Sequence, residues 1–282
     1  MRVSGKEVAD AITKKLQKQI EKLSIKPCLA IILTHEDPAS RLYVDFKIKR
    51  AEEIGVAIKY FEFTKDQLEE LKQTIKELNE DREVHGIIIQ YPIYKEWDFD
   101  ELVNLIDPKK DVDGFLKDSP YKPATAQGIW EMLTAFAFKE GFSTTEDFLT
   151  GKKIVILGRG RTAGKPTREL LESKGFNVVV VTRDTENPQL VIKSGDVVIS
   201  ATGVKNIVNE SNLKEDAYVV GVGVGKEVIG GLEKTYGDIN EEEVSKIAKL
   251  YCPTIGGIGP LTIISLLKNT IDAASHAARV IV

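Results

Sequence analysis

The chain of 282 residues carries 39 Lys and Arg against 43 Asp and Glu, which gives a net charge of −4 with both signs scattered along its length. This balance argues against a nucleic-acid partner, and no segment offers the roughly 18 uninterrupted apolar residues of a membrane helix. The length favours two domains, while a polar N-terminus and two distant cysteines, Cys28 and Cys252, predict a soluble cytoplasmic protein without a disulfide or zinc site.

The N-terminal half alternates helical and strand-like patterns, as in a parallel α/β sheet. Apolar residues recur every three or four positions from Val8 to Leu23, and Gly55 ends a second predicted helix. The polar loop 107–115 closes this half, and such loops carry the chemistry of α/β sheets. In chain order we expect a helix over 8–23, a strand over 28–33, a helix over 39–54, a strand over 56–63, a helix over 67–78, a strand over 86–90, a turn over 91–93 and a helix over 98–106, where Asp98 and Glu101 have capping-box spacing.

The C-terminal half continues the alternation after residues 122–128. We expect a helix over 128–137 to link the two halves. A strand over 153–157 then enters a glycine-rich loop and a helix. Further strands are expected over 177–182, 196–201 and 217–222, and a last helix over 261–281 follows the glycine-rich segment 256–260.

Tyr43 and Lys47 lie four residues apart in the helix predicted over 39–54, which puts the phenol and the amine on one face. Two such groups can orient a ring substrate and exchange protons with it. The same spacing is common on ordinary amphipathic helices, where the ring packs on the core and the amine is solvated. The pair therefore indicates a site only if other segments converge on it.

The segment Gly158-x-Gly160-x-x-Ala163 lies between a predicted strand and a predicted helix, where it satisfies the dinucleotide-binding fingerprint. Glycines let backbone N–H groups approach a pyrophosphate, and the helix N-terminus adds a favourable dipole. A tight turn without a ligand is the alternative. We favour the cofactor because strand, loop and helix occur in the required order.

The end of the next strand bears on which nicotinamide cofactor is used, because an acidic residue there accepts from ribose hydroxyls while Arg pairs with a 2′-phosphate. Arg183 comes first at this position, and Arg159 and Arg161 add positive charge, so the sequence favours NADP over NAD. If Asp184 rather than Arg183 faced the ribose, the preference would reverse.

Five blocks together resemble the bifunctional methylenetetrahydrofolate dehydrogenase/cyclohydrolase family, in the family's order and over essentially the whole chain. The resemblance implies a two-domain α/β fold: a catalytic domain over 1–119, rejoined by a C-terminal helix over 259–282, and an NADP-binding Rossmann domain over 120–258, with a cleft between them. The blocks are Pro38-Ala39-Ser40-x-x-Tyr43-x-x-x-Lys47, Gly86-Ile87-Ile88-Ile89-Gln90-Tyr91-Pro92, Lys110-Asp111-Val112-Asp113-Gly114, Gly158-Arg159-Gly160 with Gly164-x-Pro166, and Gly256-Gly257-Ile258-Gly259-Pro260-Leu261-Thr262.

The resemblance also implies an activity in one-carbon metabolism that serves purine biosynthesis. NADP would oxidise 5,10-methylenetetrahydrofolate, and water would open the methenyl product to 10-formyltetrahydrofolate, in a homodimer joined through the Rossmann domain. Lys47 carries over as the central cyclohydrolase group, Tyr43 as the ring packed on the folate, Gln90 as the partner that orients Lys47, and Asp113 as the carboxylate that holds the pterin amino group. Further implied contacts are Gly256, Gly257, Ile258 and Pro260 for the substrate and Thr125, Gly158, Arg159, Gly160, Arg183 and Val224 for the cofactor.

These roles are chemically reasonable. A free lysine has a pKa of about 10.4, so burial or a nearby cation must lower it before the amine can act as a base near neutrality. An amide such as Gln90 holds an amine without adding charge, and a carboxylate such as Asp113 suits the paired N–H donors of a pterin. Alternatively, Gln90 caps a strand end, Asp111 and Asp113 are turn residues, and 256–260 is a helix-starting turn with Pro260 near the first helical position.

The chain departs from the family pattern mainly around the cofactor. Where the family has Pro-Cys-Thr-Pro, Arg-Ser and Val-Pro, this chain has residues 123–126 as Pro-Ala-Thr-Ala, Arg159-Gly160 and Thr254-Ile255. A polar residue such as Ser is also usual where Arg183 stands. The missing hydroxyl at Gly160 and the different residue at Arg183 suggest that guanidinium groups hold the 2′-phosphate.

Two other functions compete with this one. Another NAD(P)-dependent two-domain dehydrogenase, acting on a small acid or amino acid, would not respond to the folate. A non-catalytic nucleotide sensor would bind NADP without chemistry, and the joint presence of Tyr43, Lys47, Gln90 and Asp113 argues against it. The histidines, His35, His85 and His276, follow no metal-ligand or catalytic spacing, so we expect structural or surface residues and no bound metal.

Overall fold

The computed structural model describes residues 1–34 and 37–280, and the chain divides into two compact units, each built on a parallel sheet. The three-stranded unit comprises Ala11–Ala124 and Ile263–Val282, and the five-stranded unit comprises Met1–Asp10 and Thr125–Thr262. The two-domain α/β fold is therefore confirmed. Within the described residues, no helix is both long enough and apolar enough to cross a membrane.

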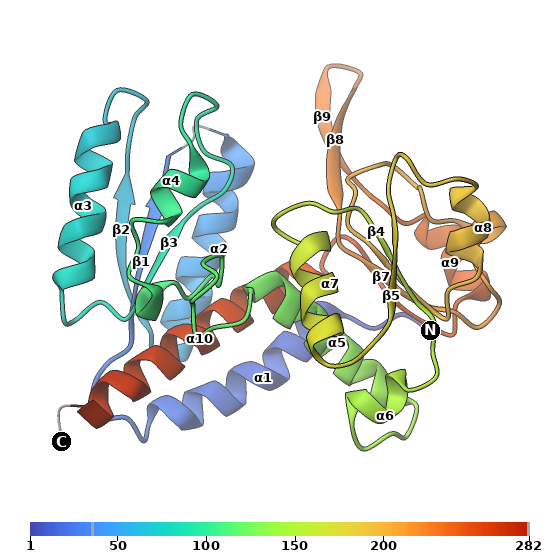
Figure 1. Ribbon diagram of the computed structural model, residues 1–282, viewed down its shortest axis with the longest axis horizontal. Helices are drawn as coiled ribbons and strands as arrows, with labels where there is room; N and C mark the ends of the chain where they lie inside the picture. The colour runs from blue at the N-terminus through green and yellow to red at the C-terminus, as the bar shows by residue number, and fades with distance from the viewer. Residues whose placement is uncertain (35–36, 281–282) are drawn as a thin grey trace. The chain divides into compact units, whose positions relative to one another are not determined.

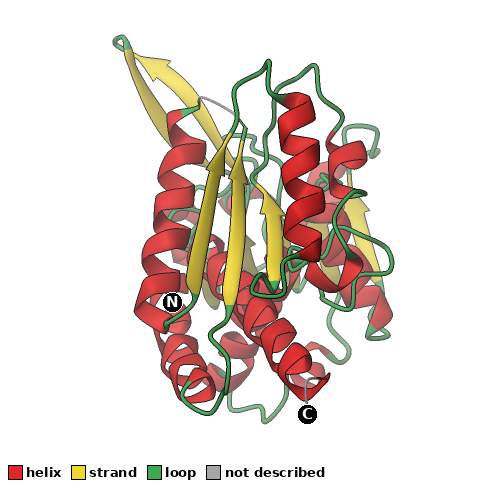
Figure 2. Cartoon of the chain, turned by 90° about the vertical axis from the view of Figure 1, so that its left-hand side faces the viewer, coloured by secondary structure: helices red, strands yellow, loops and turns green. Residues whose placement is uncertain are grey.

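The three-stranded unit has the strand order β2-β1-β3, with β1 in the centre and parallel to both neighbours (Figure 2). Every residue of β1 is buried, as expected for a central strand covered on both faces. Because the strands are parallel, their carboxyl ends share one edge. The elements of this unit are most of α1 (Gly5–Ile20), β1 (Cys28–Leu33), α2 (Pro38–Ile54), β2 (Ala57–Glu62), α3 (Leu68–Glu80), β3 (Gly86–Ile89), α4 (Phe99–Val103), the 3-10 helix η1 (Pro108–Lys110) and most of α10 (Ile258–Val280).

The five-stranded unit has the strand order β10-β7-β6-β4-β5, and all neighbouring strands in it are parallel. The chain leaves β4 first toward β5 and then crosses to β6 on the other side. Dinucleotides bind at such a reversal of strand order, outside the carboxyl ends of the strands. The elements are α5 (Ala124–Lys139), α6 (Thr145–Leu149), β4 (Ile154–Leu157), α7 (Gly164–Ser173), β5 (Val178–Val181), α8 (Pro188–Lys193), β6 (Val197–Ser200), the 3-10 helix η2 (Glu210–Asn212), β7 (Tyr218–Gly221), β8 (Val224–Ile229), β9 (Leu232–Gly237), α9 (Glu241–Ile247) and β10 (Leu250–Cys252).

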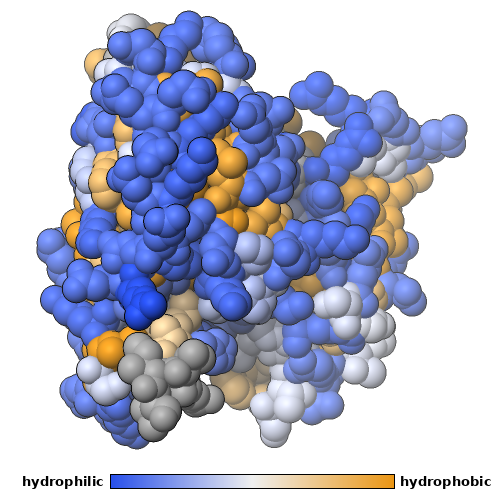
Figure 3. Space-filling model, turned by 60° about the vertical axis from the view of Figure 1, so that its left-hand side comes forward, coloured by the Kyte–Doolittle hydropathy of each residue, from blue (hydrophilic) through white to orange (hydrophobic). Residues whose placement is uncertain are grey.

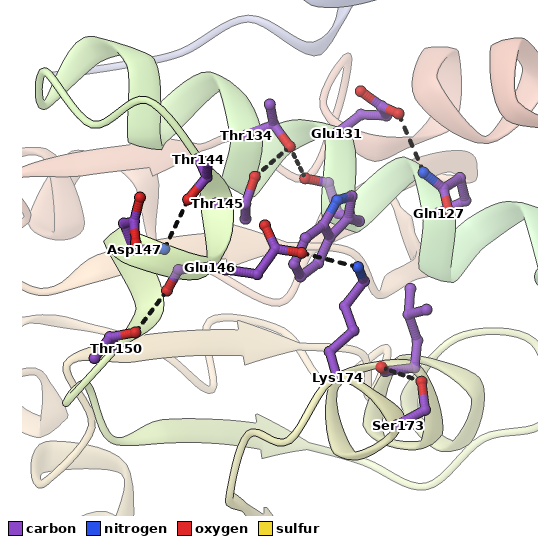
Figure 4. Close-up of polar contacts among 12 residues, drawn as sticks. Gln127, Glu131, Thr134, Thr144, Thr145, Glu146, Asp147, Thr150, Ser173 and Lys174 are labelled. Atoms are coloured by element: carbon purple, nitrogen blue, oxygen red, sulfur yellow. Dashed lines mark hydrogen bonds and ion pairs between the residues drawn. The ribbon is translucent and has the colours of Figure 1, made fainter.

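Helices α5, α6 and α7 of this unit are joined by polar contacts (Figure 4). The hydroxyls of Thr134 and Thr145 lie 2.7 Å apart. The Lys174 amine, just beyond α7, donates to Glu146 on α6 over 3.0 Å and lies 4.0 Å from the centre of the Trp130 ring on α5. These contacts secure the C-terminal end of α7, whose N-terminal end forms part of the glycine loop.

The predicted strand over 28–33 matches β1, and the other predicted strands agree with observed strands to within a residue or two at their ends. The helix predicted over 98–106 is wrong in length, because α4 ends at Val103. Asp98 caps α4 by accepting from the backbone N–H groups of Asp100 and Glu101, while the Glu101 carboxylate pairs with Lys72. The last helix begins at Ile258, three residues before the predicted start, and the predicted end at Ile281 lies outside the described residues.

A two-stranded antiparallel hairpin, β8 and β9, is absent from the sequence prediction. It stands out from the sheet of its own unit (Figure 1). Large apolar side chains on it are exposed, in contrast to the mainly hydrophilic face of the molecule shown in Figure 3. Such a ribbon is marginally stable alone in water.

The histidine and cysteine predictions have clear outcomes where the structure describes them. His85 is buried and structural, since its Nδ1 accepts a hydrogen bond from the Cys28 backbone N–H over 3.2 Å. His276 lies exposed on α10, whereas His35 falls outside the described residues. Cys28 and Cys252 are free thiols, both buried.

Candidate active site and cofactor loop

Helix α2 carries Lys47 on its buried face. The helix starts at Pro38, its N-cap Asp37 accepts from the Ser40 backbone N–H over 3.2 Å, and Gly55 ends it with a left-handed φ of 100°. Its buried residues recur at helical spacing, so Lys47 occupies a position where an apolar side chain would be expected. Lys47 is only 5% exposed, which is unusual for a lysine.

The Lys47 amine donates a hydrogen bond of 2.8 Å to Oε1 of Gln90, at the carboxyl end of β3. Gln90 is itself buried and fixed on both sides: its backbone N–H donates to Ile32 over 2.8 Å, and its Nε2 donates to the Tyr91 carbonyl over 2.7 Å. The amide oxygen therefore has a defined orientation toward the amine. Since Gln90 is neutral, it holds Lys47 without supplying a countercharge.

Tyr43 lies one turn before Lys47 on α2, and the Lys47 amine stands 5.1 Å from the centre of the Tyr43 ring. Cation–π attraction operates at this distance. The phenol and the amine therefore meet on one helix face as the sequence predicted.

The loop after η1 contains two aspartates with different surroundings. Asp111 is a turn residue, because its carboxylate accepts from the backbone N–H groups of Gly114 over 3.1 Å and Leu116 over 2.7 Å. Gly114 has a φ of 73°, and a Cβ there would lie 2.7 Å from the Pro123 nitrogen. Within the described residues, no hydrogen bond engages the carboxylate of Asp113. Asp111 thus holds the turn and leaves Asp113 available to a ligand.

Burial and charge move the pKa values of Lys47 and Asp113 toward each other. Burial lowers the pKa of Lys47, and the negative charge of Asp113 opposes this shift. Burial also raises the pKa of Asp113 to about 6, against the effect of Lys47. Asp113 is therefore mostly ionised at neutral pH, and Lys47 gives up its proton more easily than a free lysine. A proton carrier beside an anionic anchor is typical of a catalytic site.

The loop from β4 to α7 has the geometry of a phosphate cradle. Gly158 has a φ of 96°, and a Cβ there would lie 2.5 Å from the Ala201 carbonyl oxygen. A Cβ on Gly164 would lie 2.3 Å from the Gly158 carbonyl oxygen. Glycine is therefore required at both positions for the loop to turn tightly into the N-terminus of α7, where backbone N–H groups can receive a pyrophosphate. The residues present fit a dinucleotide.

The other predicted cofactor residues also belong to the five-stranded unit. Arg159, Gly160 and Arg183 are exposed, and no ion pair engages either arginine within the described part of the chain. Val224 is 51% exposed at the start of β8. Thr125 is half-buried in the first turn of α5.

The segment 256–260, predicted to contact the substrate, belongs to the five-stranded unit, whereas the Lys47 cluster belongs to the other. Gly256 has a φ of 74°, and a Cβ on Gly257 would lie 1.8 Å from the Pro253 carbonyl oxygen. Packing against Pro253 therefore requires glycine at position 257. Ile258 is buried, and Pro260 lies in the first turn of α10 rather than at its first residue.

Two family models together match most of the chain. Residues 3–113 match the tetrahydrofolate dehydrogenase/cyclohydrolase catalytic domain, and residues 123–278 match the NAD(P)-binding domain of the same enzymes. A relative from Acinetobacter baylyi, bifunctional protein FolD 1, is 34% identical over 96% of this chain and 93% of its own length.

Solved structures of similar proteins give the same result. The bifunctional FolD methylenetetrahydrofolate dehydrogenase/cyclohydrolase from Campylobacter jejuni superposes with a TM-score of 0.89 at 32% identity, covering 98% of this chain and 99% of that one. The Trypanosoma brucei enzyme, complexed with NADP cofactor and an inhibitor, has a TM-score of 0.89 at 27% identity, covering 99% and 98%.

Proposed function

The chain belongs to the tetrahydrofolate dehydrogenase/cyclohydrolase family, and on that premise we propose how its residues carry out the two reactions. The enzyme oxidises 5,10-methylenetetrahydrofolate to 5,10-methenyltetrahydrofolate and hydrolyses this product to 10-formyltetrahydrofolate. The observation that carries the proposal is the hydrogen bond between the buried Lys47 amine and Gln90. The negative charge of Asp113 also acts on this amine and opposes the lowering of its pKa.

Lys47 transfers protons in the hydrolysis as a general base and acid. Water adds to the bridging carbon of the cationic methenyl group, the bond from this carbon to N5 breaks, and N5 takes one of the two protons that water gives up. The cation of the substrate lowers the pKa of a nearby amine further, so Lys47 can accept the proton from water and pass it on. Gln90 keeps the amine aimed at the reacting carbon.

Tyr43 and Asp113 hold the substrate. The Tyr43 ring packs on the folate, and the Asp113 carboxylate accepts from the N–H donors of the pterin, a charge-assisted pairing stronger than a neutral one. Because the pKa of Asp113 is about 6, this pairing is present at neutral pH and is lost as the carboxylate becomes protonated below that pH. The family resemblance implies that Gly256, Gly257, Ile258 and Pro260 also contact the substrate.

NADP accepts the hydride of the oxidation. We assign its pyrophosphate to the Gly158–Gly160 turn and its 2′-phosphate to the exposed guanidinium groups of Arg159 and Arg183. The left-handed glycine of the loop and its close approach to β6 support the first assignment. Thr125 and Val224 are further cofactor contacts.

Replacing Arg183 with Ala is expected to lower the preference for NADP over NAD by about ten- to hundredfold, because one charge-assisted hydrogen bond to the 2′-phosphate is lost. The KM for NAD should stay unchanged. The measurement is the absorbance of methenyl formation with NADP and NAD in parallel, which in the unaltered enzyme also tests the proposed function. Asp184→Asn is the matched comparison: if this change, and not Arg183→Ala, alters cofactor preference, Asp184 faces the ribose and the assignment is wrong.

We also propose that the enzyme is a cytoplasmic homodimer. Two free, buried thiols suit a reducing compartment. The β8–β9 hairpin supports a second copy of the chain as the partner, because three apolar side chains near its tip are exposed and a two-stranded ribbon gains stability by packing. They are Val228 (73%), Ile229 (46%) and Leu232 (68%).

The double change Ile229→Lys and Leu232→Lys is expected to convert the dimer into a monomer, because these residues are directly opposite each other on one face of the hairpin and two charges would enter the apolar contact. Molar mass from light scattering across a dilution series measures the outcome. Leu190→Lys, on α8, is the control, since Leu190 is 69% exposed yet lies off the hairpin. A dimer that survives the double change, or that Leu190→Lys alone disrupts, would place the interface elsewhere.

A further inference from the structure

A buried carboxylate lies at the carboxyl edge of the five-stranded sheet, where no sequence pattern predicted a functional residue. Asp238 follows β9 and is 0% exposed. Among the described residues no basic side chain pairs with it, and its Oδ1 has no hydrogen-bond partner. Burying such a group is unfavourable unless its contacts are needed.

The other oxygen of Asp238 accepts two hydrogen bonds from the end of β6. The Ser200 hydroxyl and the Thr202 backbone N–H each donate to Oδ2 over 2.7 Å. The backbone of Asp238 also takes part, because its N–H donates to the Gly223 carbonyl over 3.1 Å. One residue thus connects the segments that follow β6, β7 and β9.

Gly223 makes room for this connection. A Cβ at Gly223 would lie 2.3 Å from Oδ2 of Asp238 and 2.5 Å from the Gly203 nitrogen. Gly203 has a φ of 72°, so the chain turns sharply just after Thr202. The carboxylate and the turn are therefore packed too closely for a side chain to separate them.

The same turn lies against the nucleotide loop. A Cβ on Gly158 would lie 2.5 Å from the Ala201 carbonyl oxygen and 3.4 Å from Cγ2 of Thr202. Strands β4 and β6 are neighbours at the point where the strand order reverses, which is where a dinucleotide binds. The turn 200–203 therefore lines one side of the proposed cofactor site. Asp238 fixes this turn through its hydrogen bonds with Ser200 and Thr202.

We propose that Asp238 is a positioning residue for the cofactor: its carboxylate fixes the turn 200–203 against the Gly158 loop, so that the site is formed before NADP arrives. The inference deepens the proposed dehydrogenase function and rests on it. Because the turn 200–203 is already ordered, NADP binding does not incur the entropic cost of ordering it, and the cofactor binds more tightly.

The test compares Asp238→Ala with Asp238→Asn. Asp238→Ala removes both acceptor contacts, so we expect the Kd for NADP, measured by calorimetry without folate, to rise about ten- to hundredfold, with a parallel rise in the KM for NADP. Asp238→Asn keeps an amide oxygen that can accept both hydrogen bonds and should restore affinity to within a few-fold. Hydrolysis of preformed methenyltetrahydrofolate should not change, because Lys47 belongs to the other unit. Glu215→Ala, an exposed acid of the same unit, is the control.

Two results would overturn the proposal: an unchanged Kd in folded Asp238→Ala, or a parallel loss of NADP affinity and hydrolysis, which indicates a general structural role. If Asp238→Ala does not fold, Ser200→Ala removes one of the two contacts with little loss of volume and should weaken NADP binding several-fold; no weakening refutes the role. Calorimetry tests the role of Asp238 in NADP binding independently of the proposed dehydrogenase activity. If the unaltered protein binds NADP but does not oxidise the folate, only the proposed activity is wrong.

Discussion

Lys47→Met is expected to abolish hydrolysis of methenyltetrahydrofolate, lowering its rate by about 10²- to 10⁴-fold, the usual contribution of a positioned proton carrier. Met keeps the length and the apolar stem of lysine but neither donates nor accepts a proton. The KM for the methenyl substrate should change much less than kcat, because Tyr43 and Asp113 still hold the ring. The measurement is the loss of methenyl absorbance with preformed substrate.

Unfolding should not account for this loss. Burial lowers the pKa of Lys47 in the folded protein, so between the folded and unfolded pKa values the unfolded chain binds more protons and stability falls as pH falls. Met removes this penalty, and the variant should melt at the same temperature as the parent or higher. Lys49→Met, two residues along α2 and exposed, should leave hydrolysis intact. Unchanged hydrolysis in Lys47→Met would reject the role of Lys47.

Asp113→Asn distinguishes binding from chemistry in the same assay. The amide has the shape of the carboxylate but not its charge, so the pairing with the pterin donors weakens. We expect the KM for folate to rise in both reactions while the kcat of hydrolysis falls less than in Lys47→Met. If kcat fell as steeply as in Lys47→Met, Asp113 would act on the reacting atoms.

The Lys47 cluster could be anticipated because its parts are local signals. Helical spacing puts Tyr43 and Lys47 on one face, and Gln90 ends a short apolar strand. The sequence could not separate Asp111 from Asp113, since aspartates favour turns in general. Only the backbone contacts of Asp111, which span three to five residues of a folded loop, assign the turn to it.

The β8–β9 hairpin shows a local signal that was missed. Gly230-Gly231, a two-residue connection typical of hairpins, stands between the apolar residues Val228-Ile229 and Leu232. Both glycines have positive φ, 60° and 79°, as a type I′ turn requires. The hairpin interrupts a run of parallel strands, so the pattern of the flanking sequence does not predict an antiparallel element.

No local sequence pattern predicts a role for Asp238. It follows a glycine in a polar stretch, where aspartate usually marks a turn. Its importance depends on Ser200 and Gly223, which lie 38 and 15 residues earlier and meet it only when the end of β9 packs beside the ends of β6 and β7. Contacts of this kind require the tertiary structure.

Gly158→Ala is expected to raise the KM for NADP by about ten- to hundredfold and to lower dehydrogenase activity accordingly, while hydrolysis of preformed methenyltetrahydrofolate persists. A left-handed φ of 96° costs a residue with a side chain about 1–3 kcal/mol. In addition, the new Cβ would lie 2.5 Å from the Ala201 carbonyl oxygen, so either the loop or the end of β6 must move. Both flank the place assigned to the pyrophosphate.

Gly160→Ala is the matched comparison two residues along the same loop. A Cβ at Gly160 meets nothing within 4 Å, and its φ lies outside the left-handed range. The added methyl group should therefore raise the KM for NADP far less at Gly160 than at Gly158. Equal losses in the two variants would mean that the loop tolerates no added bulk near the cofactor, and a Gly158→Ala enzyme with normal NADP affinity would show that the pyrophosphate binds elsewhere. Because Lys47, Gln90 and Asp113 belong to the other unit, retained hydrolysis reports that the catalytic domain is folded in both glycine variants.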